Sequence, residues 1–295
     1  MAPRVTIGPS GYSYPEWRGL YYPKGLSPGR FLAYTARRFG SVELNGTFYS
    51  LKSPAIFQRW AAEVPPDGFV FAVKGSRYIT HDLKLAGVEG ALANFYASGV
   101  LALGKKTGPF LWQLPPQLAF DAARAEQFLD LLPASAAEAE RLAAGHDERL
   151  LHGALTQAEE PCLYRHALEI RHPSWLAPAS LQLLERRGCA LVVADTAGRF
   201  PHAEELTADF VYVRLHGSTK LYESRYTDPE LQAWADKIER WASASGGRDV
   251  YVYFDNTAKG HAPVNAERLA AMIAARGLGA PPPLALGQLS LLDRR

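Results

Sequence analysis

Several short apolar runs in this sequence end in ionisable side chains, which could do acid–base or anion-binding chemistry. The segment ALEIRHPSW (167–175) is typical: a run that favours burial ends in Glu169 and Arg171, and a proline stops it soon afterwards. The segment VRLHG places Arg214 and His216 in the same way. A carboxylate or a histidine can transfer protons, and an arginine can bind an anionic group. These positions are therefore candidates for an active site, provided that the fold brings them together.

The elements that must position these side chains are eight β-rich runs that alternate with helical patterns. We expect strands at Arg4–Gly8, Ser41–Asn45, Phe69–Lys74, Gly108–Gln113, Tyr164–Arg171, Ala190–Asp195, Phe210–His216 and Asp249–Asp255. Strict alternation of strand and helix implies right-handed βαβ units and a parallel sheet. Eight such units in about 250 residues predict a single-domain (β/α)8 TIM barrel. An open doubly wound sheet is the alternative, but no Gly-rich phosphate turn follows the first run.

Strand parity predicts which side chains face the barrel axis, because successive residues point to opposite faces. Where the apolar members face the helices, the polar members face the axis. The predicted inward polar set is Glu43, Asn45, Lys74, Gln113, Glu169, Arg171, Asp195, Arg214, His216 and Asp255. Most end their strands, so they predict a site at the C-terminal end of the barrel, where barrel enzymes place their chemistry. The alternative is that paired charges only fill the barrel, although buried pairs are at best neutral against apolar filling.

The residue types suggest roles within this site. As catalytic residues we assign Glu43, Glu169, Asp195 and His216. As substrate-binding residues we assign Asn45, Lys74, Gln113, Arg171, Arg214, Tyr12, Trp17, Asp255 and Asn256. Three converging cations favour a phosphate, a carboxylate or a reaction oxyanion, and the carboxylates can act as bases or share a raised pKa. Because few histidines face the axis, we expect metal-independent acid–base chemistry without a cofactor; a mononuclear metal is the alternative.

Aromatic and basic residues interleave in the loops that would follow the strands. The first loop, GPSGYSYPEWRGLYYPKG, and the seventh, HGSTKLYESRY, are the clearest examples. Rings beside cations can stack nucleic-acid bases and meet phosphates, support a sugar, or simply pack a lid. The sequence thus leaves open a nucleic-acid-binding or processing protein, and a binding module without turnover, beside the small-molecule enzyme.

With these motifs in place, the chain resembles the YecE-like family (domain of unknown function 72), a family of (β/α)8 barrels. The matching segments are GPSGYSYPEWRGLYYP, FGSVELNGTFYSLKSP, FVFAVKGSRYITH, FLWQLPP, EIRHPSW, YVRLHG and VYFDNTAKGHAPVNA. The resemblance implies a barrel with a polar C-terminal end, similar in shape to sugar isomerases and abasic-site endonucleases, whose metal ligands have no evident counterpart here. Asp255 stands where the family often has asparagine, and residues 133–163 are a long, Ala/Glu-rich segment that predicts an added surface helix.

The chain continues beyond the predicted barrel (residues 1–277) into a tail, residues 278–295. Three consecutive prolines indicate a stiff extended spacer. The segment after them resembles the peptide by which bacterial DNA-maintenance proteins dock on the replication sliding clamp; its contacting residues would be Gln288, Leu289, Leu291 and Leu292. The alternative is that these leucines pack on the N-terminal end of the barrel.

Composition adds few constraints. The chain has 295 residues, of which 47% are hydrophobic, so it can bury a large core. A net charge of +2 does not by itself indicate a nucleic-acid partner. Cys162 and Cys189 show neither metal-type spacing nor a disulfide framework, and we find no signal peptide or membrane-spanning run. We therefore expect a soluble cytoplasmic protein whose partner is an anionic small molecule or a nucleic acid.

Overall fold

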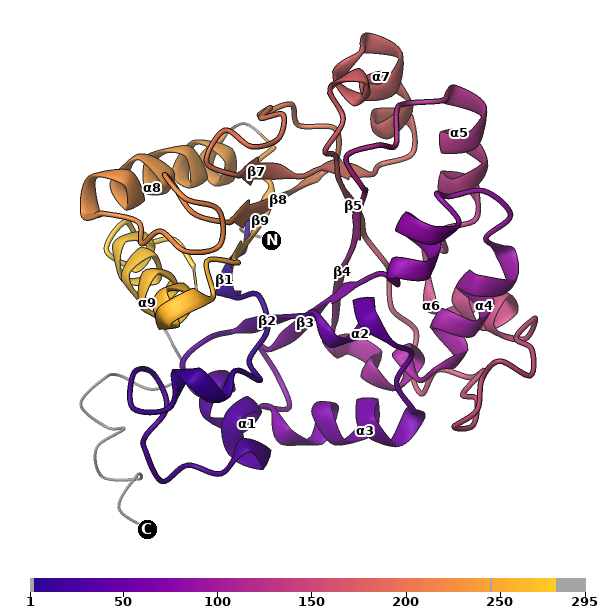
Figure 1. The fold of residues 1–295 in the computed structure, drawn as a ribbon, viewed down its shortest axis with the longest axis horizontal. Helices are drawn as coiled ribbons and strands as arrows, with labels where there is room; N and C mark the ends of the chain where they lie inside the picture. The colour runs from indigo at the N-terminus through magenta and orange to yellow at the C-terminus, as the bar shows by residue number, and fades with distance from the viewer. Residues whose placement is uncertain (1–2, 245, 280–295) are drawn as a thin grey trace.

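The strands of the computed structural model, which describes residues 3–244 and 246–279, form a closed ring surrounded by helices (Figure 1). In chain order they are β1 (Val5–Pro9), β2 (Ser41–Leu44), β3 (Val70–Lys74), β4 (Thr107–Gln113), β5 (His166–Glu169), β6 (Ala190–Leu191), β7 (Val193–Asp195), β8 (Phe210–Leu215) and β9 (Asp249–Phe254). All paired strands are parallel. The predicted (β/α)8 barrel is therefore confirmed. The sixth predicted strand is interrupted at Val192 and gives β6 and β7.

The helices fill the outer layer of the molecule. They are α1 (Phe31–Ala36), α2 (Gly46–Tyr49), α3 (Pro54–Glu63), α4 (Glu89–Ala97), α5 (Ala122–Asp130), α6 (Ala136–Ala143), α7 (Pro178–Arg186), α8 (Asp228–Ser243) and α9 (His261–Ala274). Short 3-10 or π turns lie at Pro15–Trp17, Pro28–Arg30, Tyr78–Asp82, Val100–Lys106, Pro173–Leu176 and Ala258–Gly260. Local sequence explains why α8 begins where it does: Thr227 and Glu230 form a capping box that satisfies free N–H groups of the first turn.

The Ala-rich segment between β4 and β5 does contain a helix, as its composition predicts. Helix α6 buries Ala136, Ala139 and Ala143, and it lies beside α4 (Figure 1). Ser135 caps its N-terminus by accepting the Glu138 N–H at 3.3 Å. Small alanine side chains let the two helices approach closely, so the segment adds to the outer layer and leaves the strand order unchanged.

Apolar residues fill the N-terminal half of the barrel interior. The inner cluster comprises Ala72, Leu111, Ala167, Ala190, Val192, Ala194, Phe210, Tyr212, Tyr251 and Tyr253. The alternate strand residues, such as Val42, Leu168 and Val213, face the helices. This alternation is what parity predicts for a barrel strand. Because the inner cluster fills the N-terminal half of the interior, the polar inward residues lie at the C-terminal end of the barrel. We call this end the mouth.

The barrel consists of two sheets, β1-β9-β8-β7 and β2-β3-β4-β5-β6, and β1 and β2 meet at a seam between them. A bridge joins Ser10 to Glu43 at the mouth end of this seam. Gly8 permits the close approach, because a Cβ there would lie 2.1 Å from the Ser41 carbonyl oxygen. The seam is thus tight where the polar residues lie.

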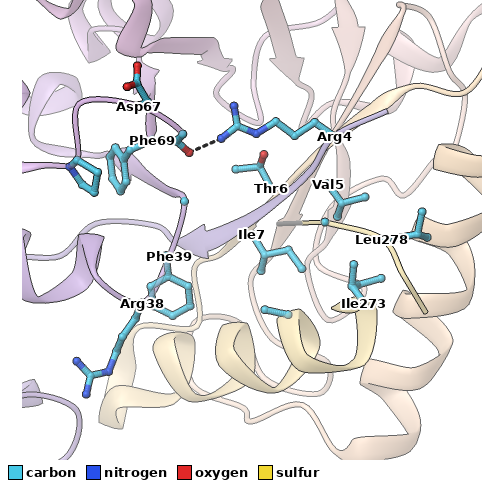
Figure 2. A pocket seen from close by; sticks show the side chains of 15 residues that line it. Arg4, Val5, Thr6, Ile7, Arg38, Phe39, Asp67, Phe69, Ile273 and Leu278 are labelled. Atoms are coloured by element: carbon cyan, nitrogen blue, oxygen red, sulfur yellow. Dashed lines mark hydrogen bonds between the residues drawn. The ribbon is translucent and has the colours of Figure 1, made fainter. Parts of the chain in front are cut away.

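At its other end the seam opens into a cavity lined by Arg4, Thr6, Phe39 and Phe69, among others (Figure 2). Arg4 reaches across it and donates to the Gly68 carbonyl oxygen. The last described residues, Leu278 and Gly279, also line this cavity. The predicted clamp-docking residues Gln288, Leu289, Leu291 and Leu292 lie outside the described residues.

Within the described part of the chain, we find no helix with the length and hydropathy needed to cross a bilayer.

Candidate functional site

Arg214, at the carboxyl end of β8, is the centre of the mouth. Its guanidinium is fully buried and donates to Glu43 at 2.7 and 3.0 Å, to Glu169 at 2.6 Å and to Asp255 at 3.0 Å. These carboxylates come from β2, β5 and the end of β9, as parity predicts. Five inward residues therefore form one unit, which we call the charge cluster: Glu43, Glu169, Arg214, His216 and Asp255.

His216 lies between two carboxylates of this cluster. Its Nδ1 is 3.0 Å from Asp255 Oδ2, and its Nε2 is 3.4 Å from Glu169 Oε1. Complete burial opposes a charged ring, but Glu169 and Asp255 outweigh it and raise the pKa of His216 above its usual value. The imidazolium form is therefore more populated at a given pH than in an ordinary histidine.

Two carboxylates of the cluster, Glu169 and Asp255, are held toward their ionised forms. Burial alone would raise the pKa of Glu169, but Arg214, His216 and Arg171 hold it well below its usual range. Burial likewise opposes the charge on Asp255, and Arg214 with His216 lowers that pKa. A buried, ionised and hydrogen-bonded network is thus present at the mouth, and its groups hold one another in their charged forms.

Two residues that sequence reasoning did not include in the site orient Glu43. The Tyr212 hydroxyl donates to Glu43 Oε2 at 2.6 Å, and the Ser10 hydroxyl donates to Glu43 Oε1. Asn45 Nδ2 in turn donates to Ser10 Oγ at 2.8 Å. Extending parity past the predicted end of the first strand would have found Ser10, since it is the next inward position after Gly8.

Lys74, Gln113 and Arg171 form the side of the mouth closest to solvent, and we call them the rim residues. Lys74 Nζ donates to Gln113 Oε1 at 2.9 Å. Arg171 donates to Glu169 Oε1 at 3.2 Å and to the Tyr222 hydroxyl at 3.1 Å. Burial, followed by the nearby Arg214 charge, lowers the pKa of Lys74 to about 8. All three were predicted to face the axis, and the structure places them there.

His81 adds information about the electrostatic field at the mouth, and sequence reasoning did not single it out. Burial lowers its pKa to about 4, and Arg171, Arg77 and Lys74 contribute in the same direction. Since three nearby cations help to lower the pKa of His81, the electrostatic potential on this side of the mouth is positive. The signal in the sequence was its position in GSRYITH, directly after β3.

The predicted inward orientation of Asp195 is wrong. Val192 and Ala194 face the axis, so Asp195 shares the outer face with Val193. Its Oδ2 accepts the Tyr226 hydroxyl at 2.9 Å, and the side chain lines a separate cavity beside α8. Asp195 therefore does not contribute to the charge cluster.

Three residues expected to bind substrate instead support the surrounding loops. Trp17 is fully buried, and its indole donates to the Thr257 carbonyl at 2.8 Å. Tyr12 lies near Glu63, and burial raises its pKa to about 12. Asn256 donates to the Ser224 carbonyl at 2.9 Å and to Asn265 at 3.0 Å, which ties the loop after β8 to α9.

Among residues 3–244 and 246–279, the histidines, cysteines and carboxylates form no group of three arranged to hold a metal ion. In the charge cluster, the carboxylate oxygens instead accept hydrogen bonds from Arg214.

Comparisons with known proteins agree with the fold. A family model described as "Protein of unknown function DUF72" matches residues 6–286. The UPF0759 protein YecE of Escherichia coli K12 is 25% identical over 263 residues, covering 80% of this chain and 82% of YecE. The UPF0759 protein YunF of Bacillus subtilis is 24% identical, covering 90% and 93%. The crystal structure of a DUF72 family protein from Thermotoga maritima is similar with a TM-score of 0.71 and 26% identity, covering 92% and 99% of the two chains.

Proposed function

The chain belongs to the DUF72 family, and we propose that it is an enzyme that uses the mouth for acid–base chemistry on a phosphorylated or otherwise anionic small molecule. One observation carries this proposal: five ionisable groups are buried together at the end of the barrel where TIM-barrel enzymes react. Apolar side chains would fill that space at least as stably. Such a network is better explained by a function than by packing.

The charge balance of the mouth favours an anionic substrate. Three carboxylates face the three cations Arg214, Arg171 and Lys74, and the raised pKa of His216 shifts the balance toward positive charge. Arg214 is fully buried, whereas Lys74 and Arg171 keep slight exposure and are the cations that a ligand could meet. A phosphate or carboxylate group would bind them through charge-assisted hydrogen bonds.

Burial divides the roles that the sequence suggested. Glu43 and Glu169 are enclosed and hold Arg214 and His216, so we assign them as positioning residues. Asp255 retains slight exposure and touches His216, so it can pass a proton between the imidazolium and a bound substrate. Asn45, Gln113, Lys74 and Arg171 would contact the substrate.

Titration of inorganic phosphate into the protein, followed by calorimetry, tests this proposal. We expect Arg171→Met to weaken phosphate binding at least about tenfold, since it removes one charge-assisted contact. Arg187→Met is the matched control, because Arg187 is an exposed arginine that pairs with Glu126 and Asp130 on the outer helices. Equal affinity of both variants and the unmodified protein would contradict an anion site at the mouth.

A nucleic-acid ligand is the second candidate, favoured by aromatic side chains near the mouth. Tyr49 is 77% exposed and Tyr78 is 44% exposed, on the segments that follow β2 and β3. Single-stranded bases stack on such rings, and Arg77 lies beside Tyr78. We expect the DNA affinity to fall steeply with salt and to fall further in Tyr49→Ala. Clamp binding that survives deletion of residues 288–292 would contradict the docking-peptide hypothesis.

A further inference from the structure

Lys74 differs from the other cations of the mouth in its partners. Arg214 and Arg171 form ion pairs with carboxylates at 2.6–3.2 Å. Within the described residues, Lys74 forms no ion pair, and its ammonium donates to the neutral amide of Gln113. A carboxylate partner would hold the lysine in its charged form. An amide does so only weakly, so the neutral amine is more easily formed at Lys74 than at a lysine paired with a carboxylate.

Lys74 is buried and held in a fixed position. Its Nζ lies 4.3 Å from the centre of the Phe48 ring, and the Thr47 hydroxyl donates to the Lys74 carbonyl at 2.6 Å. The next residue is Gly75, where a Cβ would lie 2.2 Å from the Trp112 ring, so the backbone is packed against that indole. Burial in such a site disfavours the ammonium, which is how lysines become nucleophiles.

We propose that Lys74 is a nucleophile that forms an imine with an aldehyde or ketone group of the substrate. This inference rests on the proposed function, because the same mouth must bind the anionic part of that substrate. The substrate class is then a small carbonyl compound that bears a phosphate or a carboxylate. The anion would lie toward Arg171, where His81 indicates a positive potential.

The reaction balances with water as the only product besides the imine. The neutral Nζ attacks the carbonyl carbon, the C–N bond forms as the C=O π bond breaks, and the proton lost by the nitrogen passes to the carbonyl oxygen to give a neutral carbinolamine. A second proton converts that hydroxyl to water, which leaves as the C=N bond forms. One proton is taken up overall, because the imine nitrogen is left protonated. The cluster is able to supply it, since the imidazolium of His216 adjoins Asp255.

Reductive trapping tests the inference on the full chain. The probe is glyoxylate, a small aldehyde with a carboxylate, with cyanoborohydride to reduce the imine and peptide mass spectrometry to locate it. At pH 7 a lysine with a pKa of about 8 is neutral roughly 200 times more often than one at about 10.4. Since burial restricts access, we expect Lys74 to be labelled at least about tenfold more than Lys220, whose side chain is 69% exposed.

The pH profile and one variant make the test decisive. Labelling of Lys74 should level off above about pH 8, whereas labelling of an ordinary lysine continues to rise. Lys74→Arg removes the amine, so labelling of the mouth should be lost, whereas the control Lys220→Arg should leave the labelling of Lys74 unchanged. Labelling of Lys74 no greater than that of Lys220, in protein that binds phosphate, would overturn the imine but leave the proposed function intact. If the unmodified protein does not bind phosphate, the proposed function itself is contradicted.

Discussion

Replacement of Arg214 by methionine would leave three buried carboxylates without their shared cation. The guanidinium makes hydrogen bonds of 2.6–3.0 Å to Glu43, Glu169 and Asp255 and one of 3.1 Å to Ser10. Removal of one partner from a buried ion pair typically costs about 3–5 kcal/mol. We therefore expect the free energy of unfolding at pH 7 to fall by about that amount in Arg214→Met. Urea unfolding followed by circular dichroism measures it.

The stability difference between Arg214→Met and the unmodified protein should depend on pH in a definite direction. In the unmodified protein the pKa of Glu169 and Asp255 is lowered, so their contribution is present above the unfolded values and is lost only as the pH falls through the lower folded values. Without Arg214, burial raises these pKa values, so the variant should gain stability as the pH falls from 7 to 5. The gap between the two proteins should therefore narrow over that range.

Two further variants control the experiment. Arg187→Met removes an exposed ion pair and should change stability by less than about 1 kcal/mol. Adding Glu169→Gln to Arg214→Met removes one of the orphaned charges and should recover part of the lost stability. If Arg214→Met is as stable as the unmodified protein at pH 7, or if the gap widens toward pH 5, the cluster is not held together by this cation.

Three other predictions concern single positions. The raised pKa of His216 means that its contribution to stability is present below its unfolded value and is lost as the pH rises through the folded value; His216→Gln should flatten the stability profile above the ordinary histidine value of about 6.5, and an unchanged slope would contradict this. Gly8→Ala should destabilise the barrel by roughly 1–3 kcal/mol, because the Cβ would meet the Ser41 carbonyl; in the control Gly25→Ala nothing lies within 4 Å of the new Cβ, and equal effects would argue against a tight seam. Asp195→Asn should leave phosphate affinity unchanged while lowering stability by about 1 kcal/mol, and a loss of affinity would place Asp195 in the site after all.

Strand parity predicted most of the charge cluster because its strands have clearly phased neighbours. In VRLHG, Val213 and Leu215 are large and apolar, so Arg214 and His216 must take the other face. In ALVVAD (190–195) both faces are apolar, since the strand is buried on both sides and reads as a continuous run. The phase of this strand is set by small residues that fit the narrow interior. The sequence does not reveal that choice, so the orientation of Asp195 was predicted wrongly.

The partners within the site were beyond sequence reasoning. That Glu43, Glu169 and Asp255 all meet one guanidinium depends on the heights of three strands around the ring. His81 reaches the mouth from a π turn, and Tyr222 reaches Arg171 with a positive φ of 64°. Loop conformations of this kind follow from tertiary packing and not from periodicity.

The seam between β1 and β2 is closed by members of the polar network itself. Ser10 and Glu43 face each other there, and Arg214, which belongs to the same sheet as β1, binds both Ser10 and, across the seam, Glu43. The two sheets of the barrel are therefore held together at this seam by the same side chains that shift the pKa values at the mouth. If the contact between Ser10, Glu43 and Arg214 opened, water would enter along β1 and the charges of the site would change at the same time. A substitution in this network is therefore expected to change both the chemistry of the mouth and the closure of the barrel.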